Sequence, residues 1–434
     1  MIIATLSEEK VNVKIAICSL SQFTYVAEFI DAAQRLNERH EVCYFLGFYC
    51  QNSIKILQQK HLSYQAILDE RIDIKSTLID PATANYPCEI FQGYFFKHAE
   101  LILPELLKNI KAWKPDLILS HFRDYAGMTV AEIIGIPMVS FGTVGSPFRI
   151  EGVDPPYGAK ISQNAPNRLM QLFWELNRKF NQEIDQLYNE TIRRPYGLND
   201  ISGTSVLHSN QLVLLSTISS LSNKISPDPP YVKFVGPLFL SRSESEEVEE
   251  TDTIACIASS PKPRIFISLG TIHVEPTEKC LEALKNFSGT VIVSLGGKNG
   301  IDIASLSQRK NVIWRPFFND FYKVLKLIDA VVTIASGKIV IESLSVGKPL
   351  ICLPQQGEQY ETALRLQSLG AGEIPCPKCW DAKKFARVTE QVATEDKYSK
   401  AAAVLQAEIE RSGGVDEVVK VIAGLQMTTI LVDF

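Results

Sequence analysis

The carboxylate of Glu342 lies in an apolar stretch of the sequence, where a charged side chain is not expected. Residues 335–359 read ASGKIVIESLSVGKPLICLPQQGEQ, and Ile341 and Leu344 near Glu342 are typical core residues. An unpaired carboxylate is costly to bury. Glu342 therefore faces either water or a cleft in which it has a ligand to bind.

The residues before Glu342 predict a strand, a turn and a helix. The run AVVTIA at 330–335 indicates a strand, and Ser336 is a suitable N-cap for the helix that follows. Gly347, two residues before Pro349, is a suitable helix terminator. Glu342 would then lie about one turn inside a helix that opens at the carboxyl end of a strand, where open parallel sheets bind their ligands.

A helix N-terminus at that edge can bind a diphosphate. Free amide groups and the positive end of the helix dipole at Ser336, Gly337 and Lys338 favour an anion. Glu342, one turn deeper, could accept hydrogen bonds from the hydroxyl groups of a ribose beside that diphosphate. A second interpretation fits the spacing as well: a glutamate near a helix start can simply be a dipole partner on a solvated face.

The next strand brings a second pair of polar side chains to the same edge. The run PLICLP at 349–354 predicts a strand, and QQGEQ follows it. Because neighbouring parallel strands end at one edge of the sheet, Glu358 and Gln359 should lie on this rim as groups that bind sugar hydroxyls.

Short β-branched runs alternate with helical patterns along the whole chain, and the series restarts near residue 263. Such runs indicate parallel strands buried on both faces. We therefore expect an α/β protein with two doubly wound, Rossmann-like domains that face each other across a cleft. The expected strands are 13–20, 41–48, 116–122, 137–142, 211–217, 263–270, 290–297, 311–317, 330–335 and 349–354.

An acidic stretch, SRSESEEVEETD at 241–252, lies just before the second series. It has no apolar period, so we expect an acidic, flexible insertion or linker at 241–262. The N-terminal domain would then comprise residues 1–240 and the C-terminal domain residues 263–434. The last helix of the chain could pack back on the first domain.

The bulk composition bounds the class of protein. A chain of 434 residues exceeds one ordinary core, so two domains are expected. The net charge of −5 argues against a nucleic-acid partner. We read no signal peptide at the N-terminus, and no apolar run approaches the roughly 20 residues that span a membrane. We expect a cytoplasmic location without a membrane span. Peripheral contact with a membrane would be compatible with this expectation.

The nine cysteines are scattered, as is typical of reduced core thiols. Cys376 and Cys379 form a CPKC pair, but no second pair follows at zinc spacing. We therefore interpret this pair as a surface turn, and we expect no metal site.

Several segments together resemble the UDP-glycosyltransferase family, whose members are nucleotide-sugar-dependent glycosyltransferases with the GT-B fold. Glu342 and the motifs after it fall at the spacing of the family pattern. The segments that carry the resemblance are KPDLILSHFRDYAGMTVAEIIGIPMVSFGT at 114–143, FVGPL at 234–238, FISLGT at 266–271, VIWRPF at 312–317, VGKP at 346–349, Pro354 and GEQ at 357–359.

The resemblance implies an inverting hexosyl transfer from a UDP- or dTDP-sugar to an acceptor hydroxyl. No cofactor other than the nucleotide sugar as co-substrate, and no metal, is then required. The resemblance places the donor on the second domain and the acceptor on the first. It also implies that Gly270 and Thr271 lie at the diphosphate and that Trp314 stacks on the base.

The chain departs from the family pattern at both family histidines. Ile334, Ala335 and Ser336 stand where the family has His-Gly-Gly, and Ile334 cannot donate to a phosphate. Near the N-terminus, Tyr25 falls closest to the histidine that commonly deprotonates the acceptor. A phenol with an ordinary pKa near 10 is a poor base at neutral pH.

His121 and Asp124 are the best candidates for a substitute base. They follow the strand at 116–122, and an acid that fixes the imidazole tautomer would make the pair a base and its orienter. The alternative is that His121 caps the strand and Asp124 caps the helix that begins near Tyr125.

Two first-domain segments could hold the acceptor. Residues 144–160 read as a long mobile loop, and residues 86–103 are aromatic and apolar. Together they suggest a wide apolar pocket and a lipophilic small molecule, although the aromatic residues could equally be core.

Two other functions compete with glycosyl transfer. The loss of both family histidines is compatible with a non-catalytic GT-B homologue that acts as an auxiliary or binding protein. An epimerase or hydrolase of nucleotide sugars on the same fold is the third interpretation.

Overall fold

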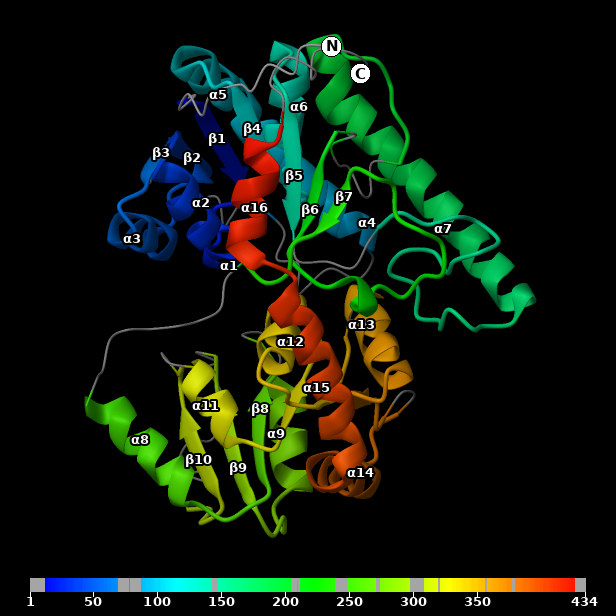
Figure 1. The fold of residues 1–434 in the computed structure, drawn as a ribbon. Coiled ribbons are helices and arrows are strands. Elements are labelled where there is room, and N and C mark those ends of the chain that lie inside the picture. The colour runs from blue at the N-terminus through cyan, green and yellow to red at the C-terminus, as the bar shows by residue number, and fades with distance from the viewer. Residues whose placement is uncertain are drawn as a thin grey trace, which may run out of the picture.

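The computed structural model describes residues 12–68, 78, 87–142, 147–203, 209, 211–238, 248–270, 274–296, 308–318, 321–355, 357–376 and 379–425. These residues form two α/β domains that lie end to end, each built around one parallel sheet (Figure 1). The fold is therefore the two-domain Rossmann-like architecture that the sequence predicts.

Among the described residues, the sheet of the first domain has seven strands in the order β3-β2-β1-β4-β5-β6-β7, all parallel. The chain passes from one side of β1 to the other between β3 and β4, so the carboxyl ends of β1 and β4 flank the topological switch point. The strands are β1 (Lys14–Ser19), β2 (Glu41–Phe48), β3 (Ser63–Leu68), β4 (Leu117–His121), β5 (Met138–Gly142), β6 (Val213–Leu215) and β7 (Val232–Phe234).

In the part of the second domain that the structure describes, the sheet has six parallel strands in the order β10-β9-β8-β11-β12-β13. Its switch point lies between β8 and β11, at the carboxyl end that carries the turn before Ser336. The strands are β8 (Arg264–Ser268), β9 (Thr290–Ser294), β10 (Val312–Arg315), β11 (Ala330–Thr333), β12 (Leu350–Cys352) and β13 (Gly372–Glu373).

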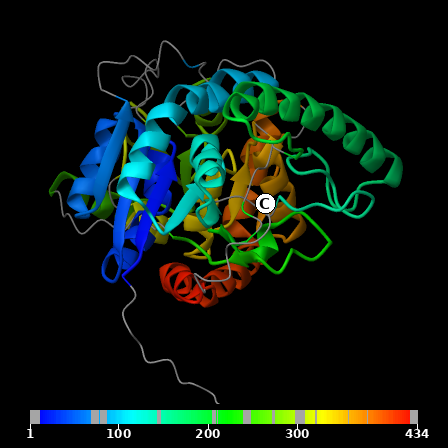
Figure 2. The ribbon, with the colours of Figure 1, turned by 90° about the horizontal axis from the view of Figure 1, so that it is seen from above.

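Helices cover both faces of each sheet and connect the strands (Figure 1). Seen from above, α7 extends along one side of the first domain (Figure 2). The helices are α1 (Phe23–Glu28), α2 (Ile30–Asn37), α3 (Gln51–Gln59), α4 (Pro87–Ile90), α5 (Lys97–Trp113), α6 (Tyr125–Ile134), α7 (Asn167–Tyr188), α8 (Val248–Ser259), α9 (Val274–Ala283), α11 (Phe321–Leu327), α12 (Gly337–Leu344), α13 (Gly357–Ser368), α14 (Ala382–Thr394), α15 (Asp396–Arg411) and α16 (Gly414–Ala423).

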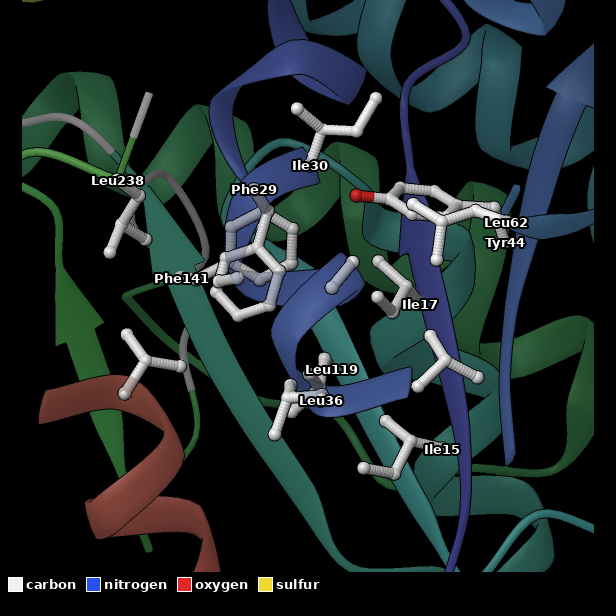
Figure 3. Close-up of a cluster of buried hydrophobic side chains, with 14 of the residues drawn as sticks. Ile15, Ile17, Phe29, Ile30, Leu36, Tyr44, Leu62, Leu119, Phe141 and Leu238 are labelled. Carbon is white, nitrogen blue, oxygen red and sulfur yellow. The ribbon is translucent and has the colours of Figure 1, made fainter. Parts of the chain in front are cut away.

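One core cluster of the first domain joins the sheet to α2 and to the end of the chain. Ile15 and Ile17 of β1 are fully buried, and the rings of Phe29 and Phe141 pack 4.4 Å apart (Figure 3). Val418 of α16 belongs to the same cluster. The last described helix of the chain thus packs on the first domain, and it crosses over from the second domain (Figure 1).

The expectation of a flexible linker at 241–262 is wrong for its second half, because residues 248–259 form helix α8. Ile257 is fully buried, and Ile254, one turn earlier, packs against the same cluster of the second domain. The surrounding acidic residues obscured this apolar pair in the sequence. Residues 239–247 lie outside the described part of the chain.

Candidate active site

Helix α12 begins at the face of the second domain that meets the first (Figure 1). Ser336 occupies the N-cap with extended backbone angles, and its side chain makes no capping hydrogen bond. The amide groups of the first turn are therefore not satisfied by this hydroxyl. Ile218 of the first domain packs in one cluster with Ile341 and Leu344, so α12 lies against the first domain.

The side chain of Glu342 points inward and not toward bulk water, since the residue is only 4% exposed. Its Oε1 lies 3.9 Å from the Nζ of Lys338, one turn earlier on α12. Desolvation lowers the pKa of Lys338, and the charge of Glu342 opposes this shift. The solvated-face interpretation of Glu342 is thus wrong. Its contact with a ribose stays a prediction.

In the turn before α12, Ala335 adopts a backbone conformation that is usually occupied by glycine. Ala335 has a left-handed φ of 63°, a conformation that costs a non-glycine residue about 1–2 kcal/mol. Gly270, after β8, is also left-handed, and a Cβ placed on it would lie 3.7 Å from the Cδ1 of Ile334. The two turns that we expect at the diphosphate therefore lie side by side. Thr271 lies outside the described residues.

Trp314 lies on β10, an edge strand, and is half-buried. Its side chain packs against the core cluster that includes Val293 and Phe385. A role in stacking on a base stays a prediction, since part of the ring serves the core.

The two polar residues at the start of α13 have different environments. The carboxylate of Glu358 is half exposed and lies 3.8 Å from the guanidinium of Arg123 in the first domain. Gln359 is buried, and its Oε1 accepts a hydrogen bond of 2.8 Å from the backbone N–H of Gln355. The side-chain oxygen of Gln359 thus stabilises the turn between β12 and α13.

The expected pairing of His121 with Asp124 is wrong. Asp124 is the N-cap of α6, where its Oδ1 accepts a 3.1 Å hydrogen bond from the N–H of Gly127. Burial raises the pKa of Asp124 to about 6, although that hydrogen bond and His121 oppose the shift. The acid beside His121 is Glu28, whose Oε2 lies 3.4 Å from Nε2 of the ring. Glu28 is distant in sequence, so spacing could not reveal the pair.

Tyr25 packs edge-on against the ring of His121, with 4.9 Å between the ring centroids. Desolvation raises its pKa to about 12, and the positive charge of Arg123 only partly opposes the shift. The phenol is therefore protonated at neutral pH.

Arg123 was not among the predicted site residues, yet its side chain reaches from the first domain to the second. Its guanidinium lies over the rings of Phe91 and Phe95, at 5.6 and 5.3 Å from their centroids, and faces Glu358. Both rings are buried in a core cluster of the first domain. The described aromatic residues of 86–103 thus serve mainly as core, which is the second of the two interpretations.

The described part of the expected mobile loop, residues 147–160, is held by the second domain. Arg149 pairs with Glu361 of α13, and both side chains are buried, at 3% and 6% exposure. The second oxygen of Glu361 accepts a 2.8 Å hydrogen bond from the N–H of Gly158. The loop is therefore anchored across the domain boundary, contrary to the expectation that it is mobile.

Within the described residues, no group of three or more His, Cys, Asp or Glu side chains could hold a metal ion. In the same part of the chain, no helix is long and apolar enough to cross a membrane.

Comparisons with known proteins agree with this architecture. Residues 274–413 match the glycosyltransferase family 28 C-terminal domain. The chain is 26% identical over 341 residues to the NDP-glycosyltransferase YjiC of Bacillus licheniformis, covering 74% of this chain and 75% of that protein. It is 30% identical over 168 residues to the demethyllactenocin mycarosyltransferase of Streptomyces fradiae, covering 38% of this chain and 36% of that protein.

The structural comparisons extend over nearly the whole chain. The glycosyltransferase of kitacinnamycin aligns with a TM-score of 0.70 at 15% identity, covering 95% of this chain and 99% of that one. The calicheamicin glycosyltransferase CalG4 aligns with a TM-score of 0.67 at 16% identity, covering 95% and 97%. Two parallel-sheet domains with these neighbours define the GT-B fold. The chain is therefore a glycosyltransferase with the GT-B fold, and it resembles the UDP-glycosyltransferase family over most of its length.

Proposed function

We propose that the protein transfers a hexose from a UDP- or dTDP-sugar to a hydroxyl of a lipophilic small molecule, with inversion at the anomeric carbon and without a metal. The observation that carries this proposal is the start of α12. No side chain caps the start of α12 at Ser336, the helix packs against Ile218 of the first domain, and the inward carboxylate of Glu342 lies 3.9 Å from the Nζ of Lys338.

This arrangement suits a nucleoside diphosphate as the leaving group. Helix amides and the dipole favour the diphosphate charge, and preorganised donors of this kind stabilise charge that develops in a transition state. In our proposal Glu342 binds the ribose, Trp314 stacks on the base, and Glu358 with Gln359 binds the hexose hydroxyls. Because the amides and Lys338 carry the leaving-group charge, transfer proceeds without a metal ion.

The names of the similar proteins support the donor and the type of acceptor. One relative is an NDP-glycosyltransferase and another a demethyllactenocin mycarosyltransferase. A third, 22% identical, is the 4'-demethylrebeccamycin synthase of Lentzea aerocolonigenes. One structural neighbour is the spinosyn rhamnosyltransferase SpnG complexed with thymidine diphosphate. We therefore infer a role in natural-product biosynthesis.

Three measurements test the proposal. A ligand that binds only the native state raises the unfolding temperature, so UDP or dTDP should raise it while adenosine does not. UDP-glucose and dTDP-glucose should then release nucleotide only when an alcohol acceptor is added, and release should persist with EDTA. The anomeric configuration of the product, read by NMR, should be opposite to that of the donor.

A second function has a specific observation in its favour. Ile334 and Tyr25 replace both family histidines, as a non-catalytic auxiliary protein would allow. Binding of UDP or dTDP without transfer to any acceptor would favour that role. Nucleotide release without an acceptor would instead indicate a hydrolase, and a changed sugar on an intact nucleotide would indicate an epimerase.

A further inference from the structure

The carboxylate of Glu28 lies where three segments of the first domain meet at the carboxyl edge of the sheet. Glu28 ends α1, His121 ends β4, and Ser216 directly follows β6. The Oε1 of Glu28 accepts a 2.9 Å hydrogen bond from the hydroxyl of Ser216, and its Oε2 lies 3.4 Å from Nε2 of His121. The carboxylate is thus held at both oxygens, and each oxygen has a second lone pair.

The imidazole of His121 is arranged to support Glu28 and not to accept a proton itself. Its Nδ1 accepts a 3.1 Å hydrogen bond from the backbone N–H of Arg123. The proton of the neutral ring is therefore on Nε2, the nitrogen that faces Glu28. A proton taken up by Nδ1 would break the contact with Arg123.

The other titratable groups nearby are unsuited to act as a base. Tyr25 keeps its proton, because desolvation raises its pKa to about 12. Asp124 is buried and uses Oδ1 as the cap of α6. The side chain of Glu28, in contrast, is 13% exposed, which leaves it open to a small hydroxyl group.

Glu28 is linked by contacts to the start of α13 on the second domain. His121, which contacts Glu28, accepts a hydrogen bond from the backbone N–H of Arg123. The guanidinium of Arg123 in turn lies 3.8 Å from the carboxylate of Glu358. The carboxylate at the end of α1 is therefore connected to the start of α13 through His121 and Arg123.

From this arrangement, and resting on the proposed function, we propose that Glu28 is the general base of the transfer and that His121 and Ser216 are its positioning residues. The acceptor hydroxyl gives its proton to a carboxylate oxygen of Glu28 as its oxygen forms the bond to the anomeric carbon. The bond from that carbon to the diphosphate oxygen breaks, and its electron pair leaves with the nucleoside diphosphate. Glu28 then returns the proton to water.

The test compares Glu28→Gln with the parent and with Glu38→Gln, a surface carboxylate of the same domain that pairs only with Arg35 in the described structure. The Glu28 variant should transfer sugar to an alcohol about 10² to 10⁴ times more slowly. Its affinity for UDP or dTDP, measured by calorimetry, should be unchanged, and Glu38→Gln should match the parent in both measurements.

An acceptor that needs no base separates chemistry from folding. Azide, or 4-nitrophenol at a pH where it is ionised, carries no proton to remove. Glu28→Gln should therefore keep near-parental transfer to these acceptors while it loses transfer to alcohols. Ser216→Ala and His121→Gln should show the same selective loss to a smaller extent, because they only disturb the orientation of Glu28.

Three results would overturn the inference. Parental transfer to an alcohol by Glu28→Gln removes the role of Glu28 alone, and the proposed function then stands. Equal loss with alcohols and with azide shows a structural role, which a lowered unfolding temperature would accompany. If the parent transfers no sugar to any of these acceptors, the proposed function fails and the role of Glu28 fails with it.

Discussion

Removing one partner of the buried ion pair between Arg149 and Glu361 should weaken the junction of the two domains. Both side chains are almost fully buried, and they come from different domains. In Glu361→Ala the guanidinium of Arg149 loses its charge partner, and the N–H of Gly158 loses its acceptor. Breaking a buried pair from one side costs about 3–5 kcal/mol, because an uncompensated charge stays buried.

The measurement is equilibrium unfolding in urea, followed by tryptophan fluorescence. Trp174 is a suitable reporter, since its Nε1 donates a 2.8 Å hydrogen bond to the carbonyl of Asp154 within the anchored segment. The control is Asp200→Ala, which removes the solvent-exposed pair with Arg194. Exposed pairs contribute little, so this variant should unfold with the parent.

A double-mutant cycle identifies the cause of the loss. Arg149→Met alone should destabilise about as much as Glu361→Ala, and the two losses should not add, because they remove the same interaction. Replacing both partners by apolar residues should recover much of the stability, since the pair also costs desolvation. If Glu361→Ala unfolds with the parent, or if the single losses add, the ion pair does not hold the junction and this reasoning is refuted.

Four further variants test the second domain and the cap of α6. Glu342→Ala should weaken binding of UDP or dTDP in calorimetry and leave the unfolding temperature near that of the parent. Trp314→Ala should weaken the same binding if the ring stacks on the base, whereas a purely core role would appear as a loss of about 3–5 kcal/mol in urea unfolding. Ala335→Gly should stabilise the protein by about 1 kcal/mol in the same assay, because the native φ of 63° strains alanine; equal stability would show that the turn is not strained. Burial raises the pKa of Asp124 above its unfolded value, to about 6, so the folded state binds the extra proton and loses stability as the pH rises from about 4 to 6. Relative to Asp124→Asn, which keeps a capping side chain, the parent should lose on the order of 2 kcal/mol across that window, and parallel pH curves would contradict the shift.

The sequence was most informative about the sheets. All ten expected strands contain an observed strand, because the continuous apolar runs mark strands that are buried on both faces. The three strands that it missed give weaker signals. β3 is half-exposed at the edge of its sheet, and β7 and β13 have three and two residues.

Local sequence signals also predicted the start of α12, but they could not predict contacts between segments that are distant in the sequence. Ser336 and Gly347 bracket the helix as expected, with Gly347 left-handed just beyond its end. In contrast, the proximity of Glu28 to His121 depends on the packing of α1 beside β4. The approach of Arg149 to Glu361 depends on how the two domains meet. The residue pattern within a single segment cannot predict either of these two contacts.

The two family histidines that this chain lacks differ in how far backbone geometry can replace them. At the turn that we expect at the diphosphate, Ala335 takes the left-handed conformation of a glycine, and the side chain of Ser336 does not cap the first turn of α12. Anion binding by amides and a dipole belongs to the backbone, so Ile334 removes one donor and leaves the remainder of the site. Deprotonation of an acceptor hydroxyl requires a basic side chain, and a backbone amide cannot serve as that base. The proposed transfer therefore needs a new base near the carboxyl ends of β1 and β4, and Glu28, held between Ser216 and His121, is the side chain that we propose for it.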